Sequence, residues 1–200
     1  MITTLVPLVD KFLLESEMVH IRDFRMAIRF YQVASELGDA GAQFSLGVLY
    51  ADGAGVPRDE AEAFRLTQLA AQQQHAGALS NLATFYVQGR VVPTNYVQAV
   101  RLFRQAADQG VRQAQVNLGE LLLTGAADVS PDPVEAVRLL RLASEQGSAT
   151  AMKLLASLYK EGKAGVPKDE LEAARLVQAA RLQGSTVLHR RQMKKESTKR

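Results

Sequence analysis

The chain has 200 residues, of which 47% are hydrophobic, carries a formal net charge of +3 and contains no cysteine. A chain of this size can bury a continuous core, and the absence of cysteine excludes a disulfide framework, a thiol nucleophile and a zinc–thiolate site, and favours a reducing compartment. No apolar run is long enough to span a bilayer, and residues 2–9 lack the basic start of a signal peptide, so we expect a cytoplasmic protein.

The first predicted element is a degenerate helix at residues 7–17, and a better-defined helix at 23–37 follows it. From there the chain repeats a unit of 36 or 37 residues. The recurring alanines and the leucines four positions after them are Ala42, Ala78, Ala114 and Ala151, and Leu46, Leu82, Leu118 and Leu155. A fixed period in this range is typical of a solenoid, in which each unit buries its apolar face by stacking on the next. Function is therefore expected on a surface that several units form together.

Each unit is predicted to contain two helices, which we name A and B. In residues 42–50, apolar positions recur every three or four residues, which indicates the A helix. Gly53 ends it because glycine adopts the left-handed backbone conformation without steric cost. Asp59 then caps the B helix. The B-helix positions predicted to be buried are Ala63, Leu66, Ala70 and Gln73.

The same template predicts the remaining elements in chain order. The A helices are expected at 39–52, 75–88, 111–124 and 148–161. The B helices are expected at 23–37, 59–73, 95–109, 132–146 and 169–183. The resulting organisation is a degenerate N-terminal helix or cap at 1–22, a solenoid of four to five repeats at 23–184, and a C-terminal cap with a basic, largely disordered tail at 185–200.

Two departures from the repeat concern turns. Gln74 stands where other units have Gly38 and Gly110, so the turn after the second B helix is less regular. The loop at 125–132 is one residue longer than the loop at 53–59. Its Asp132 still reads as a helix cap followed by proline at the first helical position. The extra residue is therefore expected to shift a loop and to leave the repeat intact.

These residues resemble the Sel1-like repeat (SLR), a relative of the tetratricopeptide repeat (TPR) with a slightly longer unit. The string GVPRDE at 55–60 returns as GVPKDE at 165–170, and Gln-Gly pairs at 109–110, 146–147 and 183–184 match the family's turn between units. The pattern within one unit is Ala42, Leu46-Gly47, Tyr50, Gly53, Gly55-Val56, Asp59, Ala63 and Ala70-Ala71. The resemblance implies an all-α fold, a right-handed α-solenoid of antiparallel helix pairs, which serves as a protein-interaction scaffold.

A polar stripe beside the buried face of the A helices is the first candidate binding surface. Solenoids of helix pairs usually present their A helices on the concave side, where successive units form one groove. The stripe is rich in amides and slightly acidic, which suits hydrogen bonding to a protein or peptide better than binding to a phosphate backbone. Its members are Ser45, Val48, Asp52, Asn81, Thr84, Gln88, Asn117, Glu120, Thr124, Leu154, Ser157 and Glu161.

One arginine recurs in every B helix, two residues after the core alanine. The five are Arg29, Arg65, Arg101, Arg138 and Arg175. They could form a ladder for an extended anionic partner. The alternative is an exposed face inherited by duplication, in which Glu62, Glu135 and Glu172 pair with three of them. We favour the second interpretation because those glutamates neutralise most of the row.

Basic charge gathers at the C-terminus, where residues 189–200 hold six Lys or Arg side chains and one glutamate. This tail supports an alternative hypothesis, a nucleic-acid or acidic-surface accessory protein. Nucleic acid is disfavoured because no aromatic residues are interleaved for base stacking. Deletion of 189–200 without loss of binding would dispose of the alternative. A homo-oligomer through the terminal helices stays open, since a solenoid end exposes apolar surface.

The sequence predicts no catalytic, cofactor or metal site. His20, His75 and His189 are scattered over different units, and His75, in a turn, is expected to be exposed. Carboxylates recur mainly as helix caps, and no glycine-rich loop carries the residues of a P-loop. The function expected is that of a non-enzymatic binding protein. The resemblance implies a regulator, an assembly adaptor or an immunity-type protein that neutralises an effector.

Overall fold

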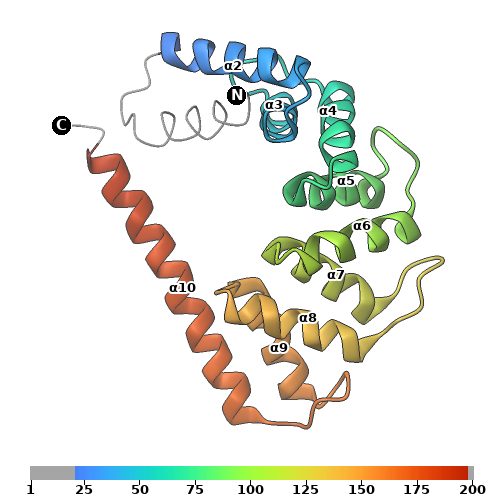
Figure 1. The fold of residues 1–200 in the computed structure, drawn as a ribbon. Coiled ribbons are helices and arrows are strands. Elements are labelled where there is room, and N and C mark those ends of the chain that lie inside the picture. Colours follow the sequence, from blue (N-terminus) through green and yellow to red (C-terminus); the bar gives the residue numbers. More distant parts are fainter. Residues whose placement is uncertain (1–20, 198–200) are drawn as a thin grey trace. The chain divides into compact units, whose positions relative to one another are not determined.

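The computed structural model describes residues 21–197, with side-chain surroundings from 26 to 183. The predicted degenerate helix at 7–17 lies outside the described residues. Within the described range the regular elements are nine α-helices, and Ala126 and Val129 form an isolated antiparallel bridge. In the order of Figure 1, the helices are α2 (Ile21–Glu36), α3 (Ala40–Asp52), α4 (Glu60–Gln72), α5 (Ala76–Gln88), α6 (Tyr96–Asp108), α7 (Arg112–Thr124), α8 (Pro133–Glu145), α9 (Ala149–Glu161) and α10 (Glu170–Ser197).

The helices begin close to where the repeat template places them. α3, α5, α7 and α9 are the A helices, and α2, α4, α6, α8 and α10 are the B helices. The predicted caps are confirmed, because side-chain oxygens of Asp59, Asp132 and Asp169 each accept a hydrogen bond from the backbone N–H three residues later. These aspartates satisfy N–H groups that the first turn of a helix leaves without a partner.

The chain divides into two compact units between Asn95 and Tyr96. In the first unit α2 packs on α3, α3 on α4 and α4 on α5. Its core includes Ile28 and Tyr31 of α2 and Leu66 of α4. Aromatic side chains seat α5 on the preceding pair: the Phe44 ring of α3 lies 4.7 Å from the His75 ring, and the Phe64 ring of α4 meets Phe85 edge-on at 5.4 Å.

The second unit repeats this arrangement with α6 to α10. α7 packs on α6 and α8, and α9 packs on α8 and α10. A core cluster joins Val116 of α7, Val137 and Leu140 of α8, and Met152 and Leu155 of α9. Within each unit, an A helix therefore packs against the side chains of the helix pair before it. This contact buries the apolar face of that pair.

Buried glutamines link successive turns in both units. The Gln73 amide nitrogen donates to the Gly38 carbonyl and to the side-chain oxygen of buried Gln43, both at 2.9 Å. Gln146 donates likewise to buried Gln115 at 2.8 Å. The prediction that Gln73 is buried is wrong. It lies exposed at the end of α4 and reaches inward only through its amide, because the buried acceptor Gln43 requires a donor.

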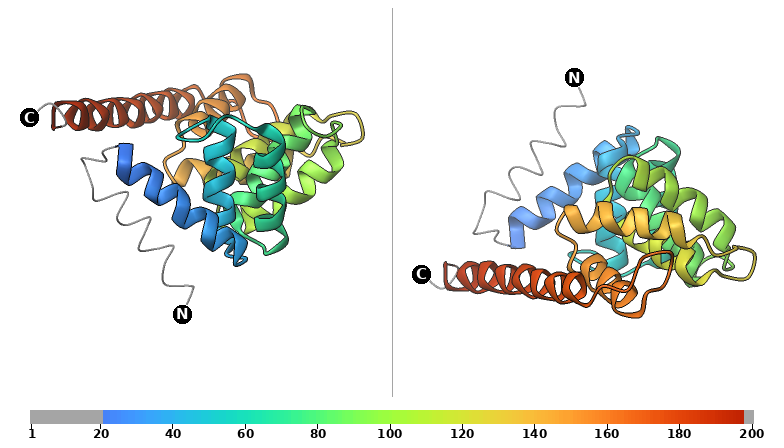
Figure 2. Two further views of the ribbon diagram at one scale, coloured as in Figure 1. Left: turned by 90° about the horizontal axis from the view of Figure 1, so that it is seen from above. Right: turned by 90° about the horizontal axis from the view of Figure 1, so that it is seen from below.

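α10 differs from the expected helix at 169–183 with a separate cap and disordered tail. It runs without a break from Glu170 to Ser197, through Gly184, and both views of Figure 2 show one long helix. In earlier repeats the Gln-Gly pair turns the chain because a packed A helix follows. Here the residues after Gly184 are mostly good helix formers, so the helix continues.

Gln74 adopts the left-handed conformation that glycine adopts in equivalent turns. Its φ is 60°, against 90° at Gly38 and 82° at Gly110. A side chain makes this conformation unfavourable by about 1 kcal/mol. We expect Gln74→Gly to raise the free energy of unfolding by about 0.5–1 kcal/mol, measured by urea denaturation. Gln68→Gly, inside α4, should lower it by about 1 kcal/mol. A Gln74→Gly variant that is less stable than the native chain would contradict the assignment of strain.

Candidate interaction surfaces

The structure places the predicted polar stripe on all four A helices. Ser45, Val48 and Asp52 lie on α3, and the other members follow at equivalent places on α5, α7 and α9. None of the twelve side chains is buried. Where apolar neighbours such as Leu46 are almost fully covered, the stripe beside them is accessible, as a binding surface requires.

Five of the stripe's ten polar side chains have partners in the protein, namely Thr84, Asn117, Thr124, Ser157 and Glu161. Gln113 donates to Asn117 at 2.7 Å, and the Ser157 hydroxyl donates to Glu161 at 3.0 Å. Asn81, Gln88 and Glu120 have no side-chain hydrogen bond or ion pair to any described residue. Their amide and carboxylate groups are therefore available to a ligand.

Neighbouring A helices lie side by side within each unit. In the first, Phe44 of α3 touches the start of α5, where a Cβ added at Gly77 would lie 2.9 Å from the Phe44 ring. In the second, Val116 of α7 shares a core cluster with Met152 of α9. Two segments of stripe are thus adjacent in each unit. A single groove through all four A helices stays a prediction.

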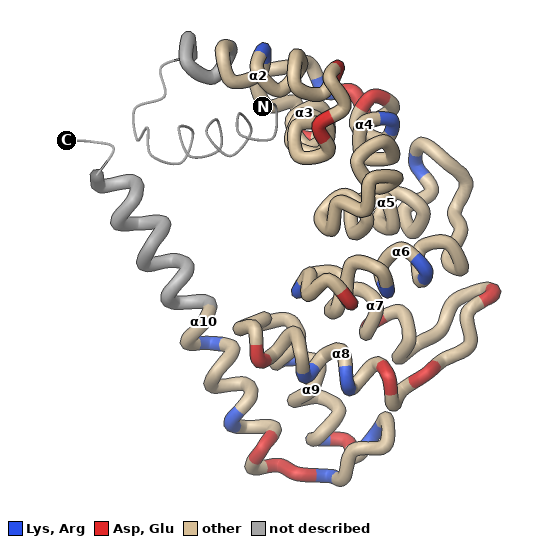
Figure 3. The backbone as a smooth tube through the Cα atoms, viewed as in Figure 1, with Lys and Arg blue, Asp and Glu red and all other residues tan. Residues whose placement is uncertain are grey.

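The five arginines of the proposed ladder are all exposed. Figure 3 colours the Lys and Arg positions along the backbone of the helices blue. Arg65, Arg138 and Arg175 form ion pairs with the glutamates three residues earlier, at 2.7, 2.7 and 3.2 Å. The guanidinium of Arg138 lowers the pKa of Glu135 through its hydrogen bonds. Arg29 and Arg101 have no ion pair among the described residues. Such exposed pairs contribute little to stability, and they neutralise most of the row, as the alternative interpretation expects.

Comparison with known proteins identifies the repeat. The Sel1 repeat pattern matches five segments, at 12–39, 40–75, 76–111, 112–148 and 149–185. The chain belongs to the Sel1 repeat family. Members of this family are generally non-catalytic scaffolds that mediate interactions between proteins. Comparison of the sequence with curated proteins gave no match.

Solved structures agree with this assignment. A Sel1 repeat protein from Oxalobacter formigenes is 33% identical with a TM-score of 0.71, over 78% of this chain and 63% of that one. A protective antigen of uropathogenic Escherichia coli strains with an SLR fold is 32% identical with a TM-score of 0.72, over 80% of this chain and 34% of that one. This chain therefore spans less than two thirds of either relative. The predicted fold class, an all-α solenoid of helix pairs, is confirmed.

A third structure shares the fold at lower identity. An immunity protein from Pseudomonas aeruginosa is 22% identical with a TM-score of 0.57, over 88% of this chain and 64% of that one. At this identity the likeness concerns the fold alone. It adds a further Sel1-like architecture without assigning its role to this chain.

His75 has a structural role in this Sel1 repeat protein that sequence reasoning missed. It was expected to be exposed, but it is half-buried against Phe44 and caps α5, its Nδ1 accepting a hydrogen bond from the Ala78 N–H at 3.2 Å. Equivalent positions hold Asp39 and Ser148, which cap α3 and α9 in the same way. This alignment with two capping residues was the signal in the sequence.

The cap at His75 makes stability depend on pH. Burial lowers the pKa of His75, although Asp39 opposes this effect. The folded state thus binds the proton less tightly than the unfolded chain does. The contribution of His75 to the free energy of unfolding is therefore complete above its ordinary pKa of about 6.5 and declines as the pH falls below that value. We expect the melting temperature to drop more between about pH 7.5 and about pH 5.5 than in His75→Asn, whose amide caps at both. Equal drops in thermal melts would contradict this role.

Other candidate chemistry is limited in the described part of the chain. No three His, Asp or Glu side chains there lie close enough to hold a metal ion, and no helix there has the length and apolarity needed to cross a bilayer. Side chains of the basic tail beyond Gln183 lie outside the described surroundings. The tail hypothesis therefore stays a prediction.

Proposed function

We propose that this Sel1 repeat protein is a non-enzymatic scaffold that binds a protein or peptide partner on the polar stripe of its A helices. The observation that carries the proposal is the state of the stripe: its members are accessible, and Asn81, Gln88 and Glu120 have no side-chain partner among the described residues. Unoccupied amides and carboxylates on the A helices suit the backbone and side chains of a peptide segment.

The role of such a scaffold would be that of a regulator, an assembly adaptor or an effector-neutralising immunity-type protein. All three roles need a surface that holds one partner without chemistry. A cytoplasmic location is part of the proposal, and the absence of cysteine supports it. Binding to nucleic acid through the basic tail is the alternative that deletion of residues 189–200 would test.

The test is capture of partners by variants of the full chain. We expect Asn81→Ala/Asn117→Ala/Glu120→Ala to lose at least about 80% of the partner that the native chain captures from a lysate of its source organism, because hot spots concentrate binding energy in few residues. The melting temperature should stay unchanged. The readout is quantitative mass spectrometry of captured proteins, with thermal melts of each variant.

A matched control carries three alanines at the ends of α4, α6 and α8, at Gln72, Asp108 and Glu145, which are exposed and occupy equivalent places on the B helices. It should capture the same partner as the native chain. Capture that survives the stripe variant would refute the proposal, and a fall in its melting temperature would show that the helix faces are misassigned. Arg101→Glu/Arg138→Glu tests the ladder in the same assay, and unchanged capture in varied salt would remove it.

A further inference from the structure

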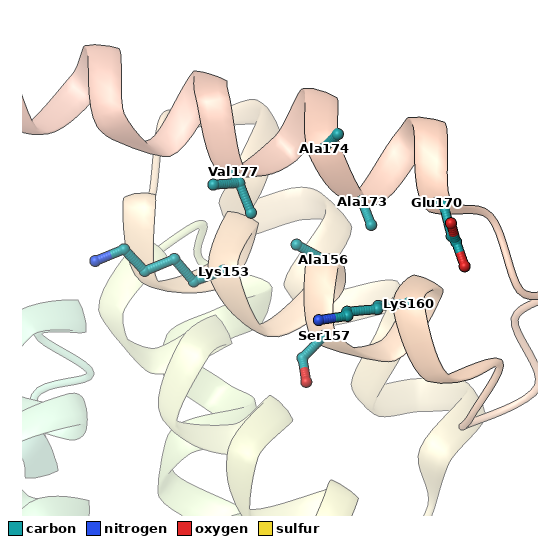
Figure 4. A pocket seen from close by; sticks show the side chains of 8 residues that line it. All are labelled: Lys153, Ala156, Ser157, Lys160, Glu170, Ala173, Ala174 and Val177. Atoms are coloured by element: carbon teal, nitrogen blue, oxygen red, sulfur yellow. The ribbon is translucent and has the colours of Figure 1, made fainter.

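The last helix pair carries an open groove. It has a volume of about 530 Å³ and lies between α9 and α10 (Figure 4). Ala156, Ala173, Ala174 and Val177 form its apolar bed, and Lys153, Ser157, Lys160 and Glu170 are its polar lining. Both helices belong to the second unit. The groove lies on the surface of α9 and α10 that a further repeat would cover.

The equivalent surfaces of α3/α4 in the first unit and of α7/α8 in the second are covered by the next A helix of the same unit. Lys153 and Ala174 correspond to Phe44 and Phe64 on α3 and α4, and those rings contact α5. In the second unit they correspond to Val116 and Val137, which are 1% and 5% exposed and share a cluster with residues of α9. The groove therefore lies where a following A helix would pack, and we call this groove the seat. No described helix covers it.

The lining of this seat differs from its covered counterparts. Ala174 leaves room where Phe64 places a ring, and Val177 is 37% exposed where Leu140 is fully buried. Lys153 replaces an apolar residue. A lysine ammonium covered by another helix would lose its hydration, and this cost would be offset only if the covering helix supplied a charge to pair with it. The seat thus suits an occupant that brings a bulky apolar side chain and a counter-charge.

The charges at the seat specify the sign of that occupant. Glu170 is paired with Lys168 at 2.9 Å. Lys153 and Lys160 have no ion pair to any described residue. The two ammonium groups therefore favour a helix that carries carboxylates beside its apolar face.

The chain's own C-terminal residues are poorly matched to the seat. If they turned back at Gly184, positions equivalent to Ala151, Leu155, Leu158 and Tyr159 would hold one apolar residue and three polar ones. These are Leu188, Gln192, Lys195 and Glu196. The segment would also bring four basic residues to a seat bordered by two lysines. In the structure its backbone continues α10 instead.

We infer that the α9/α10 groove binds an amphipathic helix of a protein partner, which packs as a further A helix would, with a bulky apolar side chain over Ala174 and Val177 and acidic side chains beside Lys153 and Lys160. This goes beyond the polar stripe of the proposed function, with which the groove shares Ser157, because it assigns a second site on the last helix pair and the class of segment that binds there. Such helix-in-groove recognition uses apolar anchors spaced along one helix face.

The probe is a pair of capped helical peptides built on α5, which fills the equivalent seat on α3 and α4. Both carry the sequence of residues 75–89. One has glutamate at the positions of Asn81, Thr84 and Gln88, and the other has lysine there. Fluorescence anisotropy with the full chain should show the glutamate peptide binding at least about tenfold more tightly than the lysine peptide, with the difference shrinking in high salt. Failure of the glutamate peptide to bind, or equal binding of the two, would overturn the inference.

Variants locate the binding. Ala174→Arg places a large side chain on the apolar floor of the groove and should weaken binding of the glutamate peptide at least about tenfold. Gln178→Arg, which is exposed on the same helix outside the groove, should leave binding unchanged. Lys153→Glu/Lys160→Glu should reverse the preference between peptides. Arg90→Glu/Arg104→Glu makes the same change in net charge at exposed positions outside the groove and the ladder, and should preserve it. The lysine reversal keeps the test decisive if Ala174→Arg fails to fold. Peptide binding that ignores both groove variants would refute the site.

Failure of this site is distinguishable from failure of the stripe. The Asn81→Ala/Asn117→Ala/Glu120→Ala variant should bind the glutamate peptide as the native chain does, since none of its three positions lines the groove. Loss of peptide binding in that variant would instead place the peptide on the stripe and contradict the α9/α10 assignment.

Discussion

Leu140→Ala is expected to lower the free energy of unfolding by about 3–4 kcal/mol, among the largest effects of any single change in this chain. Leu140 of α8 is fully buried within the cluster that joins α7, α8 and α9. Its surroundings are close-packed: a Cβ added at Gly119 would lie 3.0 Å from the Leu140 Cγ. The backbones of α7 and α8 already meet closely through glycine and alanine, so they cannot move together to fill the space.

The measurement is urea denaturation followed by circular dichroism of the helix signal. The dependence of the unfolding free energy on urea concentration is compared between variants. Val134→Ala on the same helix is the matched control, because Val134 is 73% exposed and its truncation should change stability by less than about 0.5 kcal/mol. A loss below about 1 kcal/mol for Leu140→Ala would mean that the cluster is not the core of the second unit.

The helices could be predicted from sequence because their signals are local and repeated. Apolar spacing within a dozen residues defines each A helix, and Asp59, Asp132 and Asp169 define the starts of three B helices through hydrogen bonds only three residues long. Gly53 and Gly162 end α3 and α9 in the left-handed conformation, as expected. Repetition strengthened each signal, since an ambiguous unit could be aligned with a clear one.

Features that depend on partners distant in the chain were missed or misjudged. The exposure of Gln73 follows from the needs of Gln43, 30 residues earlier. His75 is half-buried because Phe44, in the preceding A helix, stacks on it. α10 continues through Gly184, where the Gln-Gly pair matches the turns between earlier units and predicts a turn. In each case the missing information was which helix packs against the residue.

Of the two candidate surfaces, the stripe could be predicted from local sequence and the groove could not. Accessibility of the stripe followed from helical periodicity, because residues beside a buried stripe on an amphipathic helix face outward. The α9/α10 groove was not foreseen, because it depends on which surface of α9 and α10 stays uncovered and on substitutions at two positions that are covered in other repeats. Aligning Lys153 with Phe44 and Val116 was the available signal. Partner identity depends on a second molecule, which no pattern in this chain encodes.

Gly125→Ala is the second change with a large expected effect, a loss of about 3 kcal/mol in the free energy of unfolding. Gly125 ends α7 with φ 70° and ψ 179°, a region that essentially only glycine occupies. A Cβ there would lie 2.8 Å from the Val129 carbonyl oxygen and 3.0 Å from the Pro131 ring. That carbonyl already accepts a hydrogen bond from the Ala126 N–H, so it cannot withdraw without breaking the loop's only bridge in the described residues.

Gly110→Ala separates the two causes of this loss. Gly110 has φ 82°, but a Cβ there would meet nothing within 4 Å, so only the backbone conformation is penalised, by about 1 kcal/mol. Gln74 shows that such a turn accepts a side chain at this level of strain. Urea denaturation of both variants should therefore rank Gly125→Ala well below Gly110→Ala. Equal losses would mean that the longer loop at 125–132 relaxes around the new methyl group, and that its register is not fixed by Gly125.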